Sequence, residues 1–225
     1  MVKGAALVGG WRIRHERAPA GTLHAASAAA LTGAPVERTV TFMTAGAPAL
    51  VLGSHQDEGA FDLVALERNG IELARRRSGG SAVLVGAGRV SWVDFVIPSS
   101  DPLWDDDVGR AAIWVGELWA QAIAGADVWR RPMRRTDWSP VVCFAGLAPG
   151  EVTVGGRKVV GVCQRRTPAG ALFQTAALID WQPADYLRLL AAPVGDESEL
   201  AEAATGLGAG RVAAAESAIA TGLMP

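Results

Sequence analysis

The segment GEVTVGGRKVVGVCQRR, residues 150–166, predicts a β-hairpin that contains a lysine. Two valine-rich runs flank Gly155-Gly156, and paired glycines favour the left-handed backbone of a two-residue hairpin turn. Such a turn pairs Thr153 with Lys158 across the two strands. The segment therefore predicts an antiparallel register around one basic side chain.

Lys158 stands out because the chain contains only two lysines but 19 arginines. Side chains alternate along a strand, so Lys158 is expected on one face with two valines and Gln164, opposite Gly161 and Cys163. Partial desolvation on that face would lower the pKa of the lysine or direct its ammonium at a polar ligand group. The alternative is a strand-end lysine whose ammonium extends to water.

Length and composition predict one domain with a substantial core. The chain has 225 residues, of which 50% are hydrophobic and 20% charged, and no linker interrupts it. We expect a single domain over residues 1–225, with a core at about 20–190 and an Ala-rich helical C-terminal tail. The net charge of −2 and the pI of 5.9 argue against a general nucleic-acid binder.

Other features of the sequence favour a cytoplasmic protein without a metal site. No apolar run is long enough for a membrane span, and the N-terminal stretch reaches Arg12 before it completes a signal sequence. Two cysteines, Cys143 and Cys163, are too few for a disulfide scaffold and fit a reducing cytosol. Neither the cysteines nor the three histidines show metal-ligand spacing.

Periodicity along the chain predicts an α+β fold with an antiparallel or mixed sheet. An acidic run at 101–107 precedes an amphipathic helix that extends to about residue 126. Two apolar runs within 72–98 predict a further hairpin with a long turn. The remaining expected elements are helices at 21–32 and 58–70, strands at 36–43, 48–54 and 170–181, and helices after 183.

Two arginine-rich segments are candidate binding elements. In RRRSGGSAV (75–83), Gly79 and Gly80 would let the backbone approach a ligand, and Arg75 and Arg76 could donate to a carboxylate or phosphate. The alternative is a plain turn preceded by solvated charges. WRRPMRR (129–135) is best interpreted as an exposed loop, although it could also dock an acidic partner protein.

In order and spacing, four segments of the chain resemble the biotin and lipoate protein ligases and their octanoyltransferase relatives. ALVLGSHQDE (49–58) resembles a strand and turn that line the acyl pocket, and RRRSGGSAV is similar to the lipoate-binding loop. GGRKVVGVCQRR resembles the family's lysine segment, and VCFAGLAPGEVTV (142–154) resembles the cysteine segment of the cysteine-dependent octanoyltransferases. The resemblance implies the fold of that family's catalytic domain, a central mixed, largely antiparallel sheet flanked by helices. It also implies Cys143 as nucleophile and Lys158 as the residue that contacts the acyl carbonyl. The substrate-binding residues that it implies are Arg75, Arg76, Ser78, Gly79, Gly80, Ser81, Ala82, Gly161, Gln164 and Gln174.

The chain also departs from the family pattern. Val85-Gly86 stands where ligases and many transferases carry His-Asp, and Gln174 stands where many members have a histidine. A glutamine there looks more like the octanoyl-amidotransferase branch. The predicted helix at 21–32 lacks the acidic residue that is usual in the family.

The resemblance implies transfer of an octanoyl or lipoyl group to the lysine of a lipoyl carrier domain through a cysteine acyl-enzyme. Expected partners are the glycine cleavage H protein, the E2 subunits of 2-oxoacid dehydrogenases and acyl carrier protein, with no nucleic acid or membrane. A transferase would need no cofactor. The alternatives are an ATP-dependent lipoate ligase that uses ATP and Mg through lipoyl-AMP, and an inactive lipoyl-binding paralogue. We further expect Lys158→Ala to abolish transfer but preserve the fold, because a strand-end lysine contributes little to stability.

Overall fold

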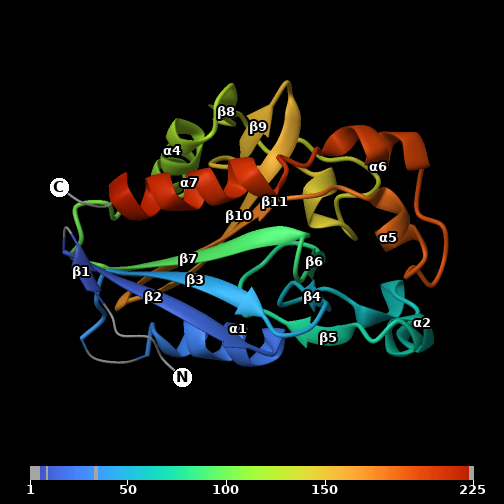
Figure 1. The fold of residues 1–225 in the computed structure, drawn as a ribbon, viewed down its shortest axis with the longest axis horizontal. Helices are drawn as coiled ribbons and strands as arrows, with labels where there is room; N and C mark the ends of the chain where they lie inside the picture. The colour runs from blue at the N-terminus through green and yellow to red at the C-terminus, as the bar shows by residue number, and fades with distance from the viewer. Residues whose placement is uncertain (1–5, 9, 33–34, 223–225) are drawn as a thin grey trace.

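The computed structural model describes residues 6–8, 10–32 and 35–222, and its centre is a mixed sheet of eight strands (Figure 1). Neighbouring strands run antiparallel except for the parallel pair β2 and β3. The predicted α+β class with a mixed, largely antiparallel sheet is confirmed. In spatial order the strands are β1 (Ala6–Val8), β2 (Trp11–Ala18), β3 (Thr39–Ala45), β7 (Val90–Pro98), β11 (Gly170–Leu178), β10 (Arg157–Thr167), β9 (Val152–Val154) and β8 (Ala126–Val128).

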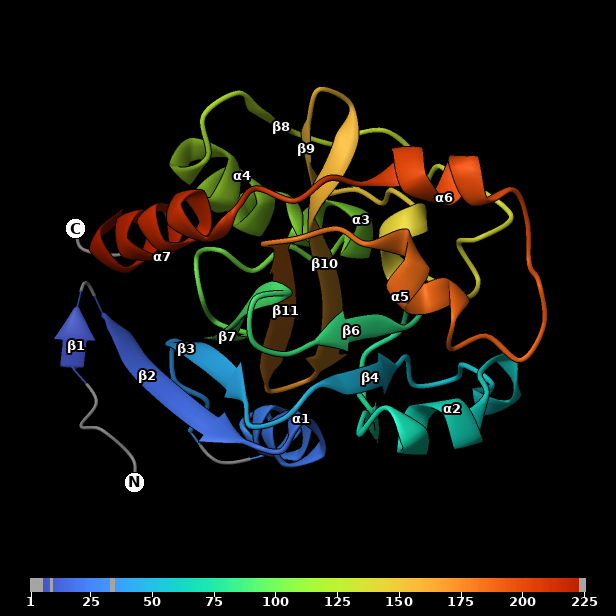
Figure 2. The same ribbon diagram turned by 45° about the vertical axis from the view of Figure 1, so that its right-hand side comes forward.

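A second, three-stranded sheet lies against one face of the large sheet (Figure 2). Its order is β5 (Glu72–Arg75), β4 (Ala49–Leu52) and β6 (Val83–Val85), with β4 parallel to β5 and antiparallel to β6. Val51 and Val85 from this sheet pack with Trp92 and Leu178 from the large sheet. This buried layer between two sheets supports the candidate site.

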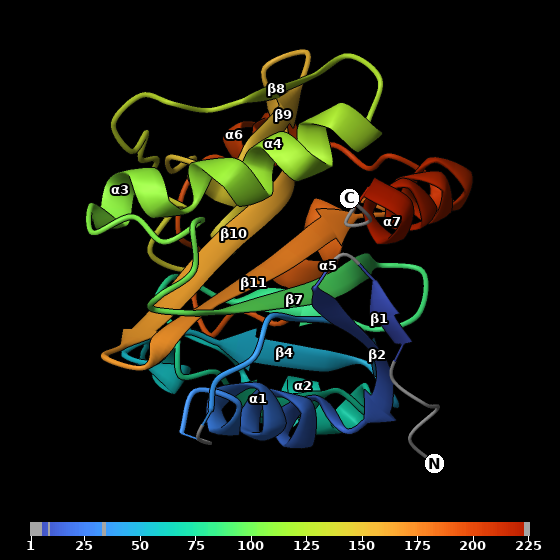
Figure 3. The same cartoon turned by 90° about the vertical axis from the view of Figure 1, so that its left-hand side faces the viewer.

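Helices cover the outer faces of the two sheets (Figure 3). Trp119 and Ile219, from two of these helices, pack with Phe95 and Phe173 on the far face of the large sheet. The helices are α1 (Ala20–Ala29), α2 (Leu63–Arg68), α3 (Val108–Ala111), α4 (Ile113–Ala122), α5 (Pro183–Leu187), α6 (Glu197–Ala203) and α7 (Ala209–Gly222), with single 3₁₀ turns η1 (Glu58–Ala60) and η2 (Cys143–Ala145). None of the helices in the described ranges has the length and apolar character that crossing a membrane requires.

The hairpin at 150–166 forms with the predicted register, but a bulge changes which side chains share a face. Thr153 pairs with Lys158, and the register then shifts before Val160. The shift turns the side chain of Lys158 to the side of Gly161, where a Cβ would lie 3.3 Å from Cε of the lysine. The prediction that Lys158 shares a face with Val160 and Gln164 was therefore wrong, because alternation of period two fails across a β-bulge.

The prediction of a hairpin within 72–98 was also wrong. β6 pairs with β4 in the small sheet, whereas β7 pairs with β3 and β11 in the large one. Both strands are buried along nearly their whole length, and side chains from both pack in the layer between the two sheets. The continuous apolar pattern of the two strands indicates that both are buried, but it does not indicate which strands pair with each other.

Other boundaries also differ from expectation. The segment 58–70 divides into η1 and α2, because Asp62 caps α2 by accepting a bond from the amide of Ala65. The core extends past about 20–190, since Trp11 of β2 and Ile219 of α7 are both buried in it.

The contact between α4 and the turn at Gly150 gives a first prediction. A Cβ on Gly116 would lie 2.2 Å from the carbonyl oxygen of Gly150, which is backbone and cannot rotate away. Gly116→Ala should therefore lower the free energy of unfolding by roughly 1–3 kcal/mol, measured by urea denaturation. The control is Gly210→Ala in α7, where a Cβ meets open space. An equal response of the two variants would contradict the tight contact.

Candidate active site

Cys143 lies at the first position of η2, beside the small sheet. Its amide donates to the carbonyl of Ala82 at 2.9 Å, and Val142 forms an isolated parallel bridge with Ala82. The cysteine is partly buried and its thiol takes part in no disulfide. The edge of the small sheet thus fixes the backbone that carries this thiol.

Two cavities meet at Cys143. They share Cys143, Val162 and Cys163 as lining residues. The first cavity is mainly apolar, and its other lining residues are His24, Arg76, Val83, Val85, Trp92, Gly161, Gln174, Thr175 and Ala176. The second contains the charged side chains of Glu151 and Lys158 in its wall and is here called the polar cavity. It is lined in addition by Gly79, Gly80, Ser81, Met133, Ser139, Gly146, Ala148, Glu151, Lys158 and Gln164. A thiol at this junction can carry a group with one apolar and one polar end.

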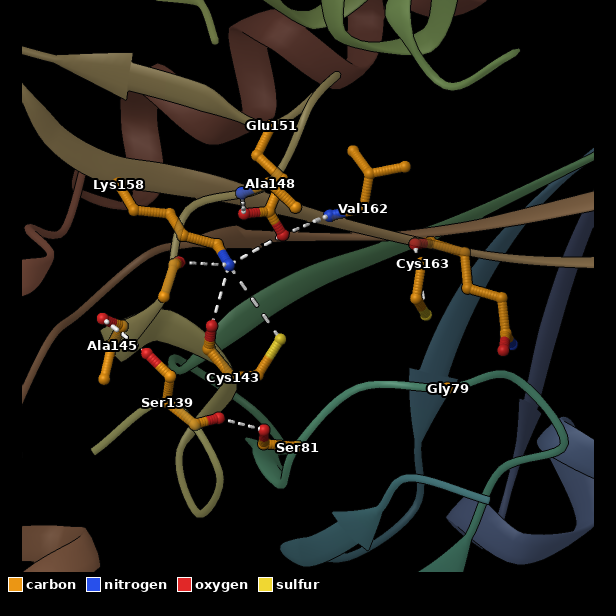
Figure 4. Close-up of polar contacts among 12 residues, drawn as sticks. Gly79, Ser81, Ser139, Cys143, Ala145, Ala148, Glu151, Lys158, Val162 and Cys163 are labelled. Carbon is orange, nitrogen blue, oxygen red and sulfur yellow. Dashed lines mark hydrogen bonds and ion pairs between the residues drawn. The ribbon is translucent and has the colours of Figure 1, made fainter. Parts of the chain in front are cut away.

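Lys158 reaches the site as a fully buried ammonium, with only 1% of the residue exposed. Its Nζ lies 2.7 Å from Oε1 of Glu151 and donates to the carbonyls of Cys143 at 2.7 Å and Gly146 at 3.0 Å (Figure 4). The same nitrogen lies 4.0 Å from Sγ of Cys143. Since an ammonium has three N–H groups, the three oxygen acceptors use its donor capacity completely.

Electrostatics keep this lysine charged. Burial by itself lowers the pKa of Lys158, but Cys143 and Glu151 outweigh it, so the pKa is raised above its ordinary value. Burial raises the pKa of the Glu151 carboxyl, and Lys158 opposes that shift. Glu151 also accepts from the amides of Ala148 at 2.7 Å and Val162 at 3.3 Å. The expected lowering of the lysine pKa is corrected, because a paired carboxylate accompanies the buried ammonium.

These contacts also correct the expectation that Lys158 is a strand-end residue of little structural weight. The ammonium joins β10 to the segment that runs from Cys143 to Glu151. Removal of one member of a buried ion pair leaves the other charged and unpaired, which is strongly destabilising. The same ammonium places a positive charge 4.0 Å from Sγ of Cys143.

The two arginines of the Gly-Gly loop bind backbone carbonyls. Arg76 is buried and donates to the carbonyls of Val51, Gly79 and Ser81 at 2.8–3.2 Å. Arg75 donates to the carbonyls of Gly53 and Gln56 and lines neither cavity at Cys143. Arg76 therefore holds the Gly-Gly loop in place, and Arg75 holds the turn that follows β4.

The conformation of this loop requires glycine at position 80, and its close packing requires glycine at position 53. Gly80 has φ of +94°, a left-handed conformation that L side chains rarely adopt. A Cβ on Gly53 would lie only 1.7 Å from the carbonyl oxygen of Gly80, so the two backbones can approach only if residue 53 is glycine. Gly79 and Gly80 then line the polar cavity.

A buried polar network lies along the apolar cavity. Ser78 donates to Oε1 of Gln174 at 2.7 Å and lies 3.2 Å from Sγ of Cys163. The amide nitrogen of Gln174 lies 3.1 Å from Nδ1 of His24 and donates to Asp94 at 3.2 Å. Because that nitrogen can only donate, Nδ1 of His24 accepts and the ring proton is on Nε2.

The charges in this network are shifted by burial. Burial, with the positive charge of Arg76, lowers the pKa of His24 to about 3, so the imidazole is neutral at pH 7. Burial raises the pKa of Asp94 to about 6, although hydrogen bonds from Ser27, Trp92 and Gln174 oppose the rise. The network consequently presents a neutral imidazole and one weakly acidic carboxyl beside the cavity.

The structure brings together most of the residues that the sequence singled out. Arg75, Ser78 and Ala82 line neither cavity. Ser78 donates to the side chain of Gln174, and the carbonyl of Ala82 accepts from the amide of Cys143. The residues around the two cavities are Arg76, Gly79, Gly80, Ser81, Cys143, Lys158, Gly161, Gln164 and Gln174.

Sequence reasoning missed Glu151, His24, Trp92 and Asp94. Glu151 had a detectable signal, since a carboxylate seven positions before an isolated lysine in one hairpin is a candidate partner. His24 had none, because 150 residues separate it from Gln174. Among the described residues, no three side chains of His, Cys, Asp or Glu gather as metal ligands would.

Comparison with known proteins identifies a family and a fold. Residues 23–212 match the family model of the lipoyl protein ligase A/B catalytic domain. Sequence comparison with curated proteins gives no significant match.

Three solved structures share the fold. A bipartite lipoate protein ligase from Thermoplasma acidophilum, described with its E2 lipoyl domain, superimposes with a TM-score of 0.69 at 18% identity over 96% of this chain and 82% of that one. A lipoate-protein ligase A bound with ATP gives 0.64 at 19% identity over 93% and 82%. P. falciparum LipL1 in complex with lipoate gives 0.60 at 12% identity over 94% and 61%.

The buried ion pair leads to a prediction about stability. Glu151→Gln and Lys158→Met should each lower the free energy of unfolding by about 3–5 kcal/mol, because each leaves one buried charge unpaired. The double variant should lose less than the sum of the two, by at least about 1 kcal/mol. Urea denaturation of all four proteins measures this coupling.

The exposed pair Arg130 and Glu117, with Nη2 and Oε1 2.7 Å apart, is the control for this cycle. Neutralising both of its members should give a coupling below about 1 kcal/mol. Strict additivity at Glu151 and Lys158 would refute the structural role of the buried pair.

Opposite pKa shifts of His24 and Asp94 predict opposite pH dependences. The folded state binds the Asp94 proton more tightly, because the pKa rises from 3.8 to about 6, so this residue lowers the free energy of unfolding as pH increases through that interval. The pKa of His24 falls from 6.5 to about 3, so this residue raises the free energy of unfolding as pH increases over that interval. The two slopes, each up to about 1.4 kcal/mol per pH unit, largely cancel where they overlap.

Single substitutions should expose each slope. Between pH 4 and 6 in rough terms, Asp94→Asn should gain stability relative to wild type as pH rises, and His24→Gln should lose it. Urea denaturation at several pH values provides the measurement. Two variants whose profiles stay parallel to that of wild type would rule out these shifts.

Proposed function

Because the chain belongs to the lipoyl protein ligase A/B catalytic-domain family, we propose that it transfers an octanoyl or lipoyl group to the lysine of a lipoyl domain through a thioester on Cys143. The supporting observation is the position of that thiol at the junction of an apolar and a polar cavity, 4.0 Å from a buried ammonium. The family match covers residues 23–212 and supports acyl transfer of this general kind.

In the first step the thiolate of Cys143 attacks the acyl carbonyl of the donor. A C–S bond forms, the bond to the donor's leaving group breaks, and that group takes up the proton that the Cys143 thiol lost when it ionised. The acyl tail enters the apolar cavity beside Val85 and Trp92, where each buried methylene contributes about 0.8 kcal/mol. The polar cavity receives the carbonyl end of the donor.

In the second step the neutral amine of the acceptor lysine attacks the thioester. A C–N bond forms, the C–S bond breaks, and the amine proton is lost as the cysteine is regenerated. Lys158 stabilises the negative charge of both tetrahedral intermediates through its ammonium. It can donate directly to the acyl oxygen only if the substrate replaces one of its three protein acceptors, Glu151 or the carbonyls of Cys143 and Gly146.

Gln174 and His24 position the acyl chain in this mechanism. Gln174 stands where many family members have a histidine, and in this chain the imidazole of His24 lies 3.1 Å from its amide nitrogen. With its pKa near 3, His24 remains neutral during turnover. Its place on the wall of the apolar cavity suits contact with the chain, away from the reacting carbonyl.

The acceptor class is inferred from the same family. The T. acidophilum ligase with this fold is described with its E2 lipoyl domain, which supports lipoyl domains as acceptors here. Acyl carrier protein and the glycine cleavage H protein are donor or acceptor candidates of the same kind. As a transferase the protein would act in the cytoplasm without a cofactor, whereas a ligase would consume ATP with Mg.

The decisive experiment is to incubate the protein with an octanoyl thioester in the absence of ATP. Intact-protein mass should show one octanoyl group on Cys143, which neutral hydroxylamine should remove because it cleaves thioesters. Cys143→Ser should lose transfer to a lipoyl domain by at least about a hundredfold, and Cys163→Ser by less than about tenfold. Cys163 is the matched control because it lines the same two cavities.

Other outcomes would exclude the proposed mechanism. Transfer that depends on ATP and persists in Cys143→Ser would identify an ATP-dependent ligase. Tight binding of the octanoyl or lipoyl group without transfer to any carrier would identify an inactive paralogue.

A further inference from the structure

The segment 129–135, WRRPMRR, forms an exposed basic loop, here called the arginine loop. Four of the 19 arginines of the chain fall within it, although the net charge of the protein is −2. Every residue from 130 to 135 is exposed. This concentration of positive charge contrasts with the acidic balance of the whole chain.

Backbone hydrogen bonds hold the arginine loop at both ends. At one end the amide of Trp129 donates to the carbonyl of Glu151 at 2.8 Å, and Gly150 donates to Trp129 at 2.9 Å. At the other end Arg134 and Leu147 exchange two bonds, of 2.8 and 3.0 Å. The loop is therefore ordered by the segment that carries Glu151, the partner of Lys158.

Two arginine side chains of the loop lie against one aromatic ring, and one of the four arginines pairs with a carboxylate. The guanidinium carbons of Arg131 and Arg134 lie 5.5 and 5.6 Å from the ring centre of Trp129. Arg130 pairs with Glu117. Within the described ranges, no carboxylate forms an ion pair with Arg131, Arg134 or Arg135.

The arginine loop also forms part of the rim of the polar cavity. Met133, at the centre of the loop, lines that cavity together with Cys143 and Lys158 and is still 43% exposed. A macromolecule that approaches Cys143 through this cavity therefore meets Met133, which Arg131, Arg134 and Arg135 flank in the chain.

We propose that the arginine loop is the docking surface for an acidic face of the carrier domain that presents the acceptor lysine, an inference that rests on the proposed function. Carboxylates around that lysine would pair with Arg131, Arg134 and Arg135, while the lysine enters the polar cavity past Met133. Complementary charge of this kind accelerates encounter and fixes orientation.

The structure favours an acidic protein over a nucleic acid. Single-stranded nucleic acids bind through basic grooves in which aromatic rings stack on the bases. The ring of Trp129 is already packed by Arg131 and Arg134, and its Nε1 donates to the carbonyl of Pro132 at 3.1 Å. The loop thus offers positive charge without a free stacking platform.

Charge reversal separates docking from chemistry. The test protein carries Arg131→Glu, Arg134→Glu and Arg135→Glu in the full chain. The matched control carries Arg17→Glu, Arg68→Glu and Arg157→Glu, which are exposed arginines on other elements and change the net charge equally. Two reactions are compared: acylation of Cys143 by octanoyl-N-acetylcysteamine, and octanoyl transfer to an isolated lipoyl domain with acidic residues around its lysine.

The expected result is specific to the protein acceptor. The triple variant should raise KM for the lipoyl domain by about tenfold or more and lose most of the salt dependence of kcat/KM. Acylation by the small thioester should stay within about twofold of wild type, and the control triple variant should match wild type in both reactions.

Three results would overturn the proposal. They are an unchanged KM and salt dependence in the triple variant, an equal loss in the control, and an equal loss with the small thioester. Tighter binding of an RNA oligonucleotide than of the lipoyl domain, abolished by the same substitutions, would assign the loop to nucleic acid instead. If wild-type Cys143 takes up no octanoyl group, the proposed function fails, and binding of the lipoyl domain to the two triple variants, measured by calorimetry, still decides the surface.

Discussion

The site depends on the buried ion pair between the ammonium of Lys158 and the carboxylate of Glu151. An isolated charge in a protein core costs several kcal/mol, so the lysine can be buried only where carboxylate and carbonyl oxygens surround it. Glu151 and the carbonyls of Cys143 and Gly146 meet this requirement. In doing so they fix the whole segment from 143 to 151 against β10, and with it the thiol.

The consequences of that ion pair extend to both sides of Cys143. Toward the surface, the segment 147–151 anchors the arginine loop through backbone bonds. Toward the interior, the amide of Cys143 bonds to Ala82 at the end of the small sheet. Since the small sheet stacks on the large one, the apolar cavity forms between them. The thiol of Cys143 therefore lies between the apolar cavity, which valine side chains line, and the polar cavity.

The interior network around Gln174 shows a different physical solution. Asp94, His24 and Ser78 satisfy the glutamine amide, and burial holds the histidine neutral. Gln174 thus has an imidazole within hydrogen-bond distance, supplied by α1 from another part of the chain. The neutral groups His24, Gln174 and Thr175 line the apolar cavity together with Arg76, whereas the buried ion pair of Lys158 and Glu151 lies in the wall of the other cavity.

Local sequence determined the parts of this protein that depend on near neighbours. Gly155-Gly156 specified a hairpin and its first register pair, and the motifs around Cys143 and Lys158 indicated the family and the candidate site. Three features depended on tertiary structure: the bulge after Lys158, the burial of that lysine beside Glu151, and the assignment of β6 and β7 to different sheets. The contact of His24 with Gln174 joins residues 150 positions apart. Alternation and turn propensity act over a few residues, whereas burial, ion pairing and strand choice depend on which distant segments the core brings together.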